Sequence, residues 1–424
     1  MSLSDVFQNF LSLLDYWWIA FFIAALVSFL DIWGRYWRLW FFYKARKDWI
    51  FLRVNLPRDS EKTPLAMEQV LIGMHGIAKR YFYWSHKYIW KQRTETMSLE
   101  IVGIGGSINF IIGVAKRHED MVRGAIFAHF SEAEIEIVSD YTYAVPDDPI
   151  SENWNMIGSA FKLDKDSIFP IKTYESWLLK DELEETRKND PLAVLAESYS
   201  LLKAGEQLWL QFVISPLISD EWQKWHDRAR AVRNEIDRPG NKKQNLSEET
   251  VEGSRGFFRA LIGKDPFEKK EEEKFKIRFP STIDIMVVKA ITSKIELPIF
   301  EVTMRNLYIA TKESYDKYHM SLLAGSLRLF QDSTSNHFGL DNSDRIRVKY
   351  FPEFFREHRL DYKKRRLLKH YRMRYLKEDK DSSFYLSTKE LASVFHFPGK
   401  TVSAPGLKRV PFRTSKPPEE LPTL

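Results

Sequence analysis

The stretch SLEIVGIGGSINFIIGV, residues 98–114, predicts a β-hairpin. Ser98–Val102 and Ile108–Val114 are strand candidates, and Gly103–Ser107 (GIGGS) between them supplies the glycines of a tight turn. These glycines lack the Gly-x-Gly-x-x-Gly spacing of a dinucleotide-binding loop and lie between two strands. We therefore interpret them as a turn, and they imply no cofactor.

The flanking segments extend the pattern in both directions. Trp49–Asn55 and Ala133–Val138 have the composition of strands, whereas Leu65–Tyr81 and His118–Phe130 carry apolar residues at helical spacing. The resulting order is strand, helix, strand, strand, helix, strand, which is that of a ferredoxin-like domain. We expect this first domain over residues 48–145.

A looser copy of the same order follows over residues 150–350 and predicts a second ferredoxin-like domain. Its candidate strands and helices are Trp154–Phe161, Pro191–Lys203, Gln207–Ile214, Ser219–Ile236, Ile283–Ser293, Ile299–Ala310, Tyr315–Phe330 and Arg345–Tyr350. A charged helical insertion at 237–279 interrupts it. Within the insertion, Gly253–Phe267 is amphipathic, and we interpret it as a helix tethered to its parent domain or as a peptide that contacts a partner or a membrane. The predicted fold class is α+β.

The N-terminal residues 1–47 predict a transmembrane and interfacial anchor. Tyr16–Leu30 (YWWIAFFIAALVSFL) has no charge, and the apolar character continues beyond Asp31 to Gly34. Basic residues follow on the C-terminal side, so we expect a single-pass protein of the cell membrane with its N-terminus outside and its domains in the cytoplasm. The anchor residues are Trp17, Trp18, Phe21, Phe22, Phe29 and Trp33.

The composition and motifs exclude several kinds of active site. The 424 residues include no cysteine, which excludes thiolate metal sites and cysteine nucleophiles. Gly399-Lys400-Thr401 resembles the end of a phosphate-binding loop, but Val394 stands where the first glycine is required, so we predict a turn. Neither His-Glu-x-x-His nor Gly-x-Ser-x-Gly is present. We expect no enzyme, no catalytic residue, no cofactor and no metal.

A basic helical segment is expected at 351–381. Arg356–Lys380 contains eleven Lys/Arg against four Asp/Glu, with tyrosines between them. Such a segment suits a membrane-facing helix, a nucleic-acid contact or a protein partner. The residues that we predict to bind nucleic acid or anionic lipid are Lys363, Lys364, Arg365, Arg366, Lys369, Arg372 and Arg374.

Two parts of the chain resemble a known family. Residues 49–138 (WIFLRVNLP, TPLAMEQVL, SLEIVGIGG, AEIEIV) and 384–421 (FYLSTKELASVFHFP, VSAPGLKRV, PPEEL) are similar to the membrane-anchored region that precedes the motor in HerA/FtsK-like ATPases of conjugation and type IV secretion. The resemblance carries over no ATPase residue, because that core would begin after Leu424.

The resemblance implies a non-enzymatic membrane component of a conjugative DNA-transfer or type IV secretion-like machine. Such a protein would contact the lipid bilayer, form a homo-oligomer, and tether or dock a separate HerA/FtsK-like ATPase through residues 382–424, a short helix and Pro-rich connector. The partner-binding residues are Phe395, His396, Phe397, Pro398, Pro405, Pro417 and Pro418. The alternative is a membrane-tethered protein that binds nucleic acid, DNA in particular, through residues 356–380.

Overall fold

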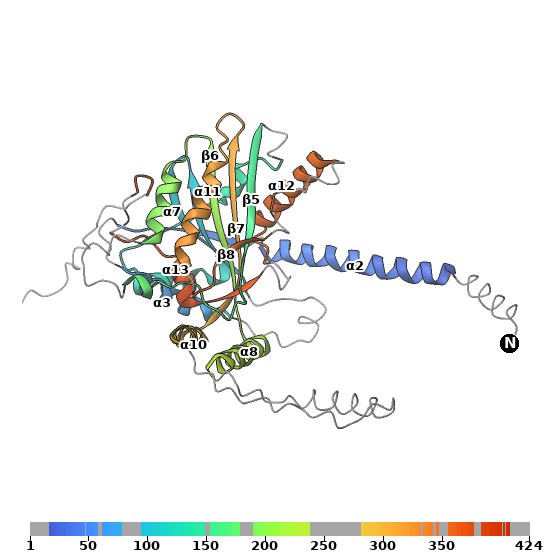
Figure 1. The fold of residues 1–424 in the computed structure, drawn as a ribbon. Helices are drawn as coiled ribbons and strands as arrows, with labels where there is room; N and C mark the ends of the chain where they lie inside the picture. Colours follow the sequence, from blue (N-terminus) through green and yellow to red (C-terminus); the bar gives the residue numbers. More distant parts are fainter. Residues whose placement is uncertain are drawn as a thin grey trace, which may run out of the picture.

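The computed structural model describes residues 17–46, 48–57, 62–78, 95–148, 153–178, 190–237, 281–331, 334–341, 345–346, 355–376, 383–400, 402 and 404–407. These residues form a nine-stranded sheet with helices on both faces and at one end (Figure 1). The α+β class agrees with the sequence-based prediction, but the domain architecture does not.

All neighbouring strands of the sheet are antiparallel. The order is β4-β1-β3-β2-β6-β7-β5-β8, and β9 pairs with the beginning of β7. The strands are β1 Trp49–Asn55, β2 Met97–Ile104, β3 Ser107–Ala115, β4 Glu134–Val138, β5 Trp154–Leu163, β6 Glu206–Pro216, β7 Ile299–Thr311, β8 Phe338–Asp341 and β9 Phe384–Ser387.

Several helices begin with a side-chain cap. Asp190 accepts a hydrogen bond from the backbone N–H of Leu192 at the start of α7, and Ser281 and Ser387 open capping boxes at α10 and α13. The α-helices are α2 Trp17–Arg46, α3 Pro64–His75, α5 Glu119–His129, α6 Glu175–Leu178, α7 Pro191–Ser200, α8 Ser219–Asp237, α10 Thr282–Ile295, α11 Tyr318–Leu327, α12 Arg356–Arg372 and α13 Thr388–Val394. Short 3-10 helices are η1 Lys116–His118, η2 Tyr141–Ala144 and η4 Arg328–Phe330.

The predicted hairpin is confirmed as β2 and β3. Gly105 and Gly106 at its turn have φ angles of +53° and +83°, a conformation that residues with a side chain rarely adopt. Gly103 serves a different purpose, because a Cβ there would lie 2.4 Å from the Tyr199 ring of α7. The glycine thus lets α7 pack directly against the backbone of β2.

The prediction of two ferredoxin-like domains was wrong. β2 and β6 pair along their lengths, from Met97 opposite Ile214 to Ile104 opposite Gln207, so both halves of the chain belong to one sheet. A single large apolar core contains residues from both halves. The physical reason is that β6 is buried along its entire length and needs a neighbour on each edge, and β2 supplies one of them.

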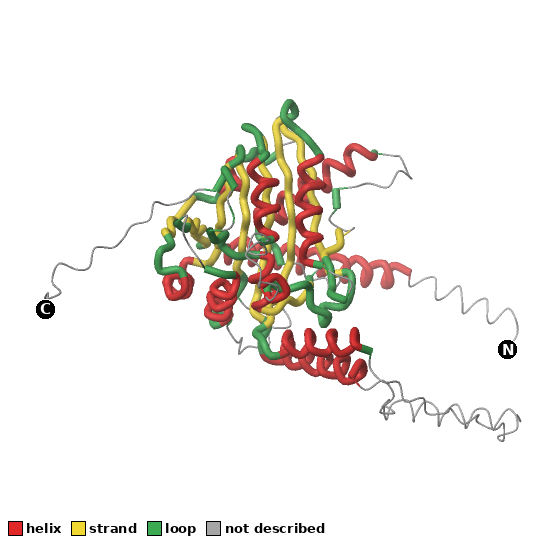
Figure 2. Tube along the Cα trace, turned by 60° about the vertical axis from the view of Figure 1, so that its left-hand side comes forward, coloured by secondary structure: helices red, strands yellow, loops and turns green. Residues whose placement is uncertain are grey.

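Helices pack against this sheet through three clusters of buried apolar side chains. Helices α3, α5, α7, α11 and α13 cover one face, while α12 packs on the opposite face (Figures 1 and 2). At one end of the sheet, α8 and α10 lie against each other through Trp225, Ala229, Ile291 and Ile295. Three separate surfaces of the sheet therefore carry helices.

The prediction of a membrane-spanning helix was also wrong. Among the residues that the structure describes, no helix is long and apolar enough to cross a membrane. The uncharged part of α2 begins at Trp17 and ends before Asp31, which is shorter than the about 20 apolar residues that a span requires. The predicted single-pass location in the cell membrane is therefore not supported. Five of the predicted anchor residues are each more than half exposed on α2: Trp18, Phe21, Phe22, Phe29 and Trp33.

Some predictions concern residues outside the described ranges. These are the charged insertion beyond Asp237 with its amphipathic segment 253–267, most of the strand expected at 345–350, and the C-terminal residues 408–424.

Candidate functional site

Helix α12 is packed on the sheet by an apolar inner side. Leu367, Leu368 and Tyr371 are buried in the same cluster as Trp209 of β6. The ring centroids of Tyr371 and Trp209 are 5.3 Å apart, and the Tyr371 hydroxyl lies 3.0 Å from that of Tyr141. These contacts decide which side of α12 faces the protein and which side faces away.

Arg374, just after α12, is an anchor of this packing. Its side chain is 3% exposed. Nε donates a hydrogen bond to Glu100 at 3.0 Å, and Nη1 and Nη2 donate to Asp140 at 2.5 and 2.9 Å. Burial alone would raise the pKa of Asp140, but its hydrogen bonds and ion pair with Arg374 lower it below the usual value. Arg374 therefore fixes the end of α12 and is not available to a ligand.

Arg372 has a similar role at the last turn of α12. Its Nη2 donates to the carbonyl oxygens of Thr142, Val145 and Pro146 at 3.0, 2.6 and 3.0 Å. Its Nη1 donates to Asp147 at 2.6 Å. Two of the seven predicted anion-binding residues thus bind the protein's own chain instead.

Lys364 and Arg365 lie at the border of the packed side. Lys364 Nζ donates to Asn155 at 3.0 Å, and burial lowers the pKa of this lysine. Arg365 donates two hydrogen bonds to Asp148, at 3.0 and 2.8 Å, but half of its side chain stays exposed.

The opposite side of α12 is exposed and basic. We call it the outer face of α12, and it consists of Phe355, His358, Tyr362, Arg365 and Lys369, which are exposed, and of Arg359 and Arg366, which are partly buried. The whole helix contains eight Lys/Arg and two Asp/Glu, a net charge of +6. The complete chain also has a net charge of +6, so its excess positive charge is concentrated on this helix.

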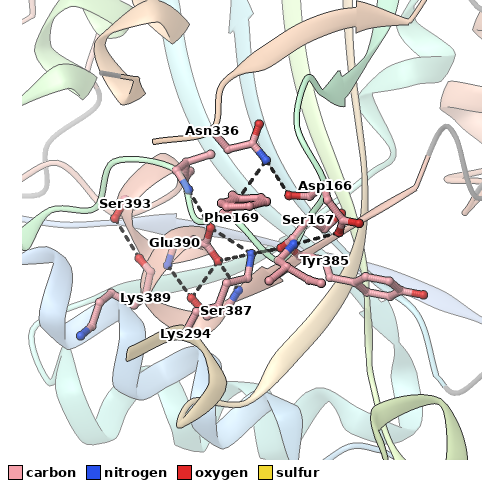
Figure 3. A network of polar contacts seen from close by, with 12 residues as sticks. Asp166, Ser167, Phe169, Lys294, Asn336, Tyr385, Ser387, Lys389, Glu390 and Ser393 are labelled. Carbon is pink, nitrogen blue, oxygen red and sulfur yellow. Dashed lines mark hydrogen bonds and ion pairs between the residues drawn. The ribbon is translucent and has the colours of Figure 1, made fainter. Parts of the chain in front are cut away.

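A second polar cluster lies in the core beneath the C-terminal segment (Figure 3). Lys294 of α10 and Glu390 of α13 form an ion pair at 2.9 Å, and each side chain is 1% exposed. Lys294 also donates to the carbonyl oxygens of Ser167 and Tyr385, at 2.6 and 2.8 Å. Burial lowers the pKa of Lys294, although the charge of Glu390 opposes the shift.

The same carboxylate accepts hydrogen bonds from three further groups. They are the backbone N–H of Ile171 at 2.9 Å and the backbone N–H and hydroxyl of Ser387, at 2.8 and 3.0 Å. Beside this pair, Asn336 donates to the carbonyl oxygens of Asp166 and Phe169 (Figure 3). The network joins four segments that are distant in the sequence and is structural, because its charged groups are hydrogen-bonded to the protein itself.

Most of the predicted partner-binding residues that the structure describes are buried. Phe395, His396, Phe397 and Pro398 are buried, the first three in contact with other core residues. Pro405 is exposed, whereas Pro417 and Pro418 lie outside the described residues. The part of the C-terminal segment from Phe384 to Pro398 is therefore packed into the fold and is not an extended peptide that can lie across another protein. The predicted turn at Gly399 is confirmed by a backbone hydrogen bond from Val402 N–H to Gly399 O at 3.3 Å.

The sheet and α12 lie within one family domain. A family model described as a domain of unknown function, DUF8128, matches residues 41–409, which include all nine strands. The chain belongs to the DUF8128 family. A search of curated proteins finds no match. Neither finding links this DUF8128 chain to HerA/FtsK-like ATPases, so the assignment to conjugation or type IV secretion is without support.

Sequence reasoning missed four residues on the outer face of α12 in this DUF8128 domain. Phe355, His358, Arg359 and Tyr362 were not among the predicted binding residues. The signal that could have found them is their spacing, since positions i, i+3, i+4 and i+7 share one side of a helix. Within the described ranges, no group of three His, Asp or Glu side chains is arranged to hold a metal ion.

Proposed function

We propose that this protein is a non-enzymatic binding component that engages nucleic acid through the outer face of α12. The observation that carries the proposal is the division of the basic residues of this helix. Arg372 and Arg374 hold the helix on the sheet, whereas Arg365 and Lys369 on the outer face are exposed. Structural anchoring therefore accounts for the inner basic residues, while the outer face presents positive charge to the solvent.

A concentrated positive surface suits a phosphate backbone. Each phosphate that a Lys or Arg neutralises releases condensed counterions, so binding weakens linearly on a logarithmic scale of salt concentration. Four basic residues lie on the outer face, Arg359, Arg365, Arg366 and Lys369, with Lys363 beside them. This density supports a partner with regularly spaced negative charges.

The experiment measures binding of the full chain to a fluorescent 20-nucleotide DNA by anisotropy, at several salt concentrations. A triple variant, Lys363→Gln, Arg366→Gln and Lys369→Gln, is expected to reduce the slope of log affinity against log salt by about 2–3. The matched control removes three charges from exposed residues of α8 and α10: Lys224→Gln, Arg230→Gln and Lys289→Gln.

Equal losses in the two variants would overturn the proposal, since the effect would then follow net charge alone. Absence of DNA binding at low salt would overturn it as well. Vesicles of phosphatidylserine and phosphatidylcholine serve as a further arm, and binding to vesicles without binding to DNA would contradict a nucleic-acid ligand.

A second candidate function is docking of a separate motor ATPase, which the sequence resemblance suggests. The observation that favours it is an apolar row at the beginning of α10, where Ile283, Ile285 and Met286 are each more than half exposed at the end of the sheet. Co-purification with a HerA/FtsK-like ATPase should be lost in the double variant Ile285→Glu, Met286→Glu and retained in the control Lys289→Glu. Equal capture by the two variants would exclude α10 as the docking surface.

A further inference from the structure

The outer face of α12 carries aromatic side chains that its packing does not explain. Phe355 is 76% exposed and Tyr362 is 64% exposed. His358 lies between them on the same side and is also exposed, with its ring centroid 6.3 Å from that of Phe355. Three neighbouring rings therefore face away from the sheet on one side of one helix.

The backbone at Phe355 makes this residue choice still less expected. Phe355 precedes α12 with φ +55° and ψ +31°, the left-handed conformation. Glycine and asparagine adopt this conformation most readily, whereas a bulky side chain there is an outlier associated with strain. An exposed phenylalanine gains no burial in return, so neither the backbone nor the core accounts for an aromatic side chain at this position.

The spacing of the rings suits unpaired bases. Positions 355, 358 and 362 are three and four residues apart, which corresponds to about 4.5 and 6 Å along a helix axis. Bases inside a duplex are stacked about 3.4 Å apart, and their faces are already covered by neighbouring bases. An extended single strand, by contrast, exposes base faces that stack on aromatic side chains without sequence preference.

The basic residues continue the same side of the helix. Arg365, Arg366 and Lys369 follow Tyr362 within two turns and complete the outer face of α12. The face thus carries its three rings in the first half, with Arg359 among them, and basic residues alone in the second half. This combination of stacking surfaces with a positive track is typical of proteins that bind single-stranded nucleic acid.

We infer that the outer face of α12 is a binding site for single-stranded nucleic acid, with bases stacked on Phe355, His358 and Tyr362 and phosphates bound by Arg365, Arg366 and Lys369. The inference rests on the proposed function, because it names the form of nucleic acid that the same face binds. It adds a preference for single strands and assigns that preference to the rings.

The experiment compares a 20-nucleotide oligothymidine with a 20-base-pair duplex, both binding to the full chain. The test variant is Phe355→Gly with Tyr362→Ala, because glycine removes the ring and accepts the left-handed backbone without strain. Single-strand affinity should fall about 30-fold or more, from the lost stacking of two bases, while duplex affinity should change less than about twofold. Tyr318→Ala, at an exposed tyrosine of α11, should change neither.

Tyr362→Trp, which keeps an aromatic ring, should retain single-strand binding. Equal losses for single strand and duplex, or no loss for either, would overturn the inference while leaving nucleic-acid binding intact. If the unmodified chain binds neither DNA, the proposed function fails together with the inference. If the same variant also lowers binding to phosphatidylserine vesicles 10-fold or more, the rings serve a general apolar contact and base stacking is refuted.

Discussion

Replacement of Arg374 by methionine should loosen α12 without unfolding the sheet. The variant leaves the Glu100 carboxylate fully buried, with Gln211 Nε2 at 3.0 Å as a remaining donor. It also removes the two hydrogen bonds to Asp140 and the contact of the guanidinium with Phe51, whose ring centroid lies 4.1 Å from Arg374 Cζ. Removing one partner from a buried ion pair costs about 3–5 kcal/mol.

The size of this effect predicts a local rather than a global change. Leu367, Leu368 and Tyr371 stay apolar and buried, and burial of each contributes about 1.5–3 kcal/mol to holding the helix on the sheet. Methionine regains part of the lost free energy by apolar burial, so we expect a net loss of about 3–4 kcal/mol. This loss is a large part of the about 4.5–9 kcal/mol that the three apolar side chains contribute together, and it should therefore raise the population of a state with α12 detached.

Hydrogen exchange followed by mass spectrometry separates α12 from the strands and measures this state. Protection of α12 amides should fall about 100- to 1000-fold, since each 1.4 kcal/mol corresponds to a factor of ten. Peptides from β6 and β7 should keep their protection. Adding Glu100→Gln to the variant should restore part of the loss, because a neutral amide is less costly to bury unpaired.

The matched control is Lys369→Met, which removes a positive charge from the exposed side of the same helix. Protection of α12 that changes less than threefold in Arg374→Met would refute the assigned anchoring role. A uniform loss of protection across α12, β6 and β7 would also contradict it, because the effect would then be global.

Two further predictions concern the buried pairs beneath the C-terminal segment. Lys294→Met should lower the free energy of unfolding by about 3–5 kcal/mol, measured by urea denaturation, and adding Glu390→Gln should recover more than about 1 kcal/mol; no recovery would show that the Glu390 charge is not the cause. Burial would raise the pKa of Asp190, but its ion pair and hydrogen bond with His396 and a hydrogen bond from the Leu192 N–H lower this pKa below the usual value. The stabilisation of the fold by ionised Asp190 is therefore complete above about pH 4 and is lost as the pH falls further. The stability difference between the unmodified chain and Asp190→Asn should therefore shrink between pH 6 and pH 3, and a constant difference would contradict this assignment.

Local patterns in the sequence were enough to predict many of the elements. Trp49–Asn55 was predicted as a strand and is β1 with the same bounds, and the glycine-rich turn joins β2 to β3 as expected. The segment from Gln207 to Ile214 was among the candidate elements, and it lies in the middle of the sheet as part of β6. Alternation, glycine positions and apolar runs are properties of neighbouring residues, so one sequence suffices to read them.

The errors concern contacts between distant residues. The pairing of β2 with β6 joins segments about a hundred residues apart, and no short pattern distinguishes the edge of a separate domain from the centre of a larger sheet. The inward course of Arg374 depends on Glu100 and Asp140, which lie far away in the sequence. The basic segment was predicted correctly as a helix from its local sequence. Its division into anchoring and exposed residues depends on these distant contacts, so it could not be predicted from the sequence.

The junction of β2 and β6 also affects how the chain folds during synthesis. When Met97–Ile104 leaves the ribosome, its partner strand Glu206–Pro216 is still about a hundred residues from completion. At about 5–20 residues per second, the nascent chain presents an unpaired strand edge for about 5–20 s. During that interval β2 is open to pairing with the same strand of another nascent chain, so the yield of native protein should depend on holding this edge apart from its copies until the second half emerges.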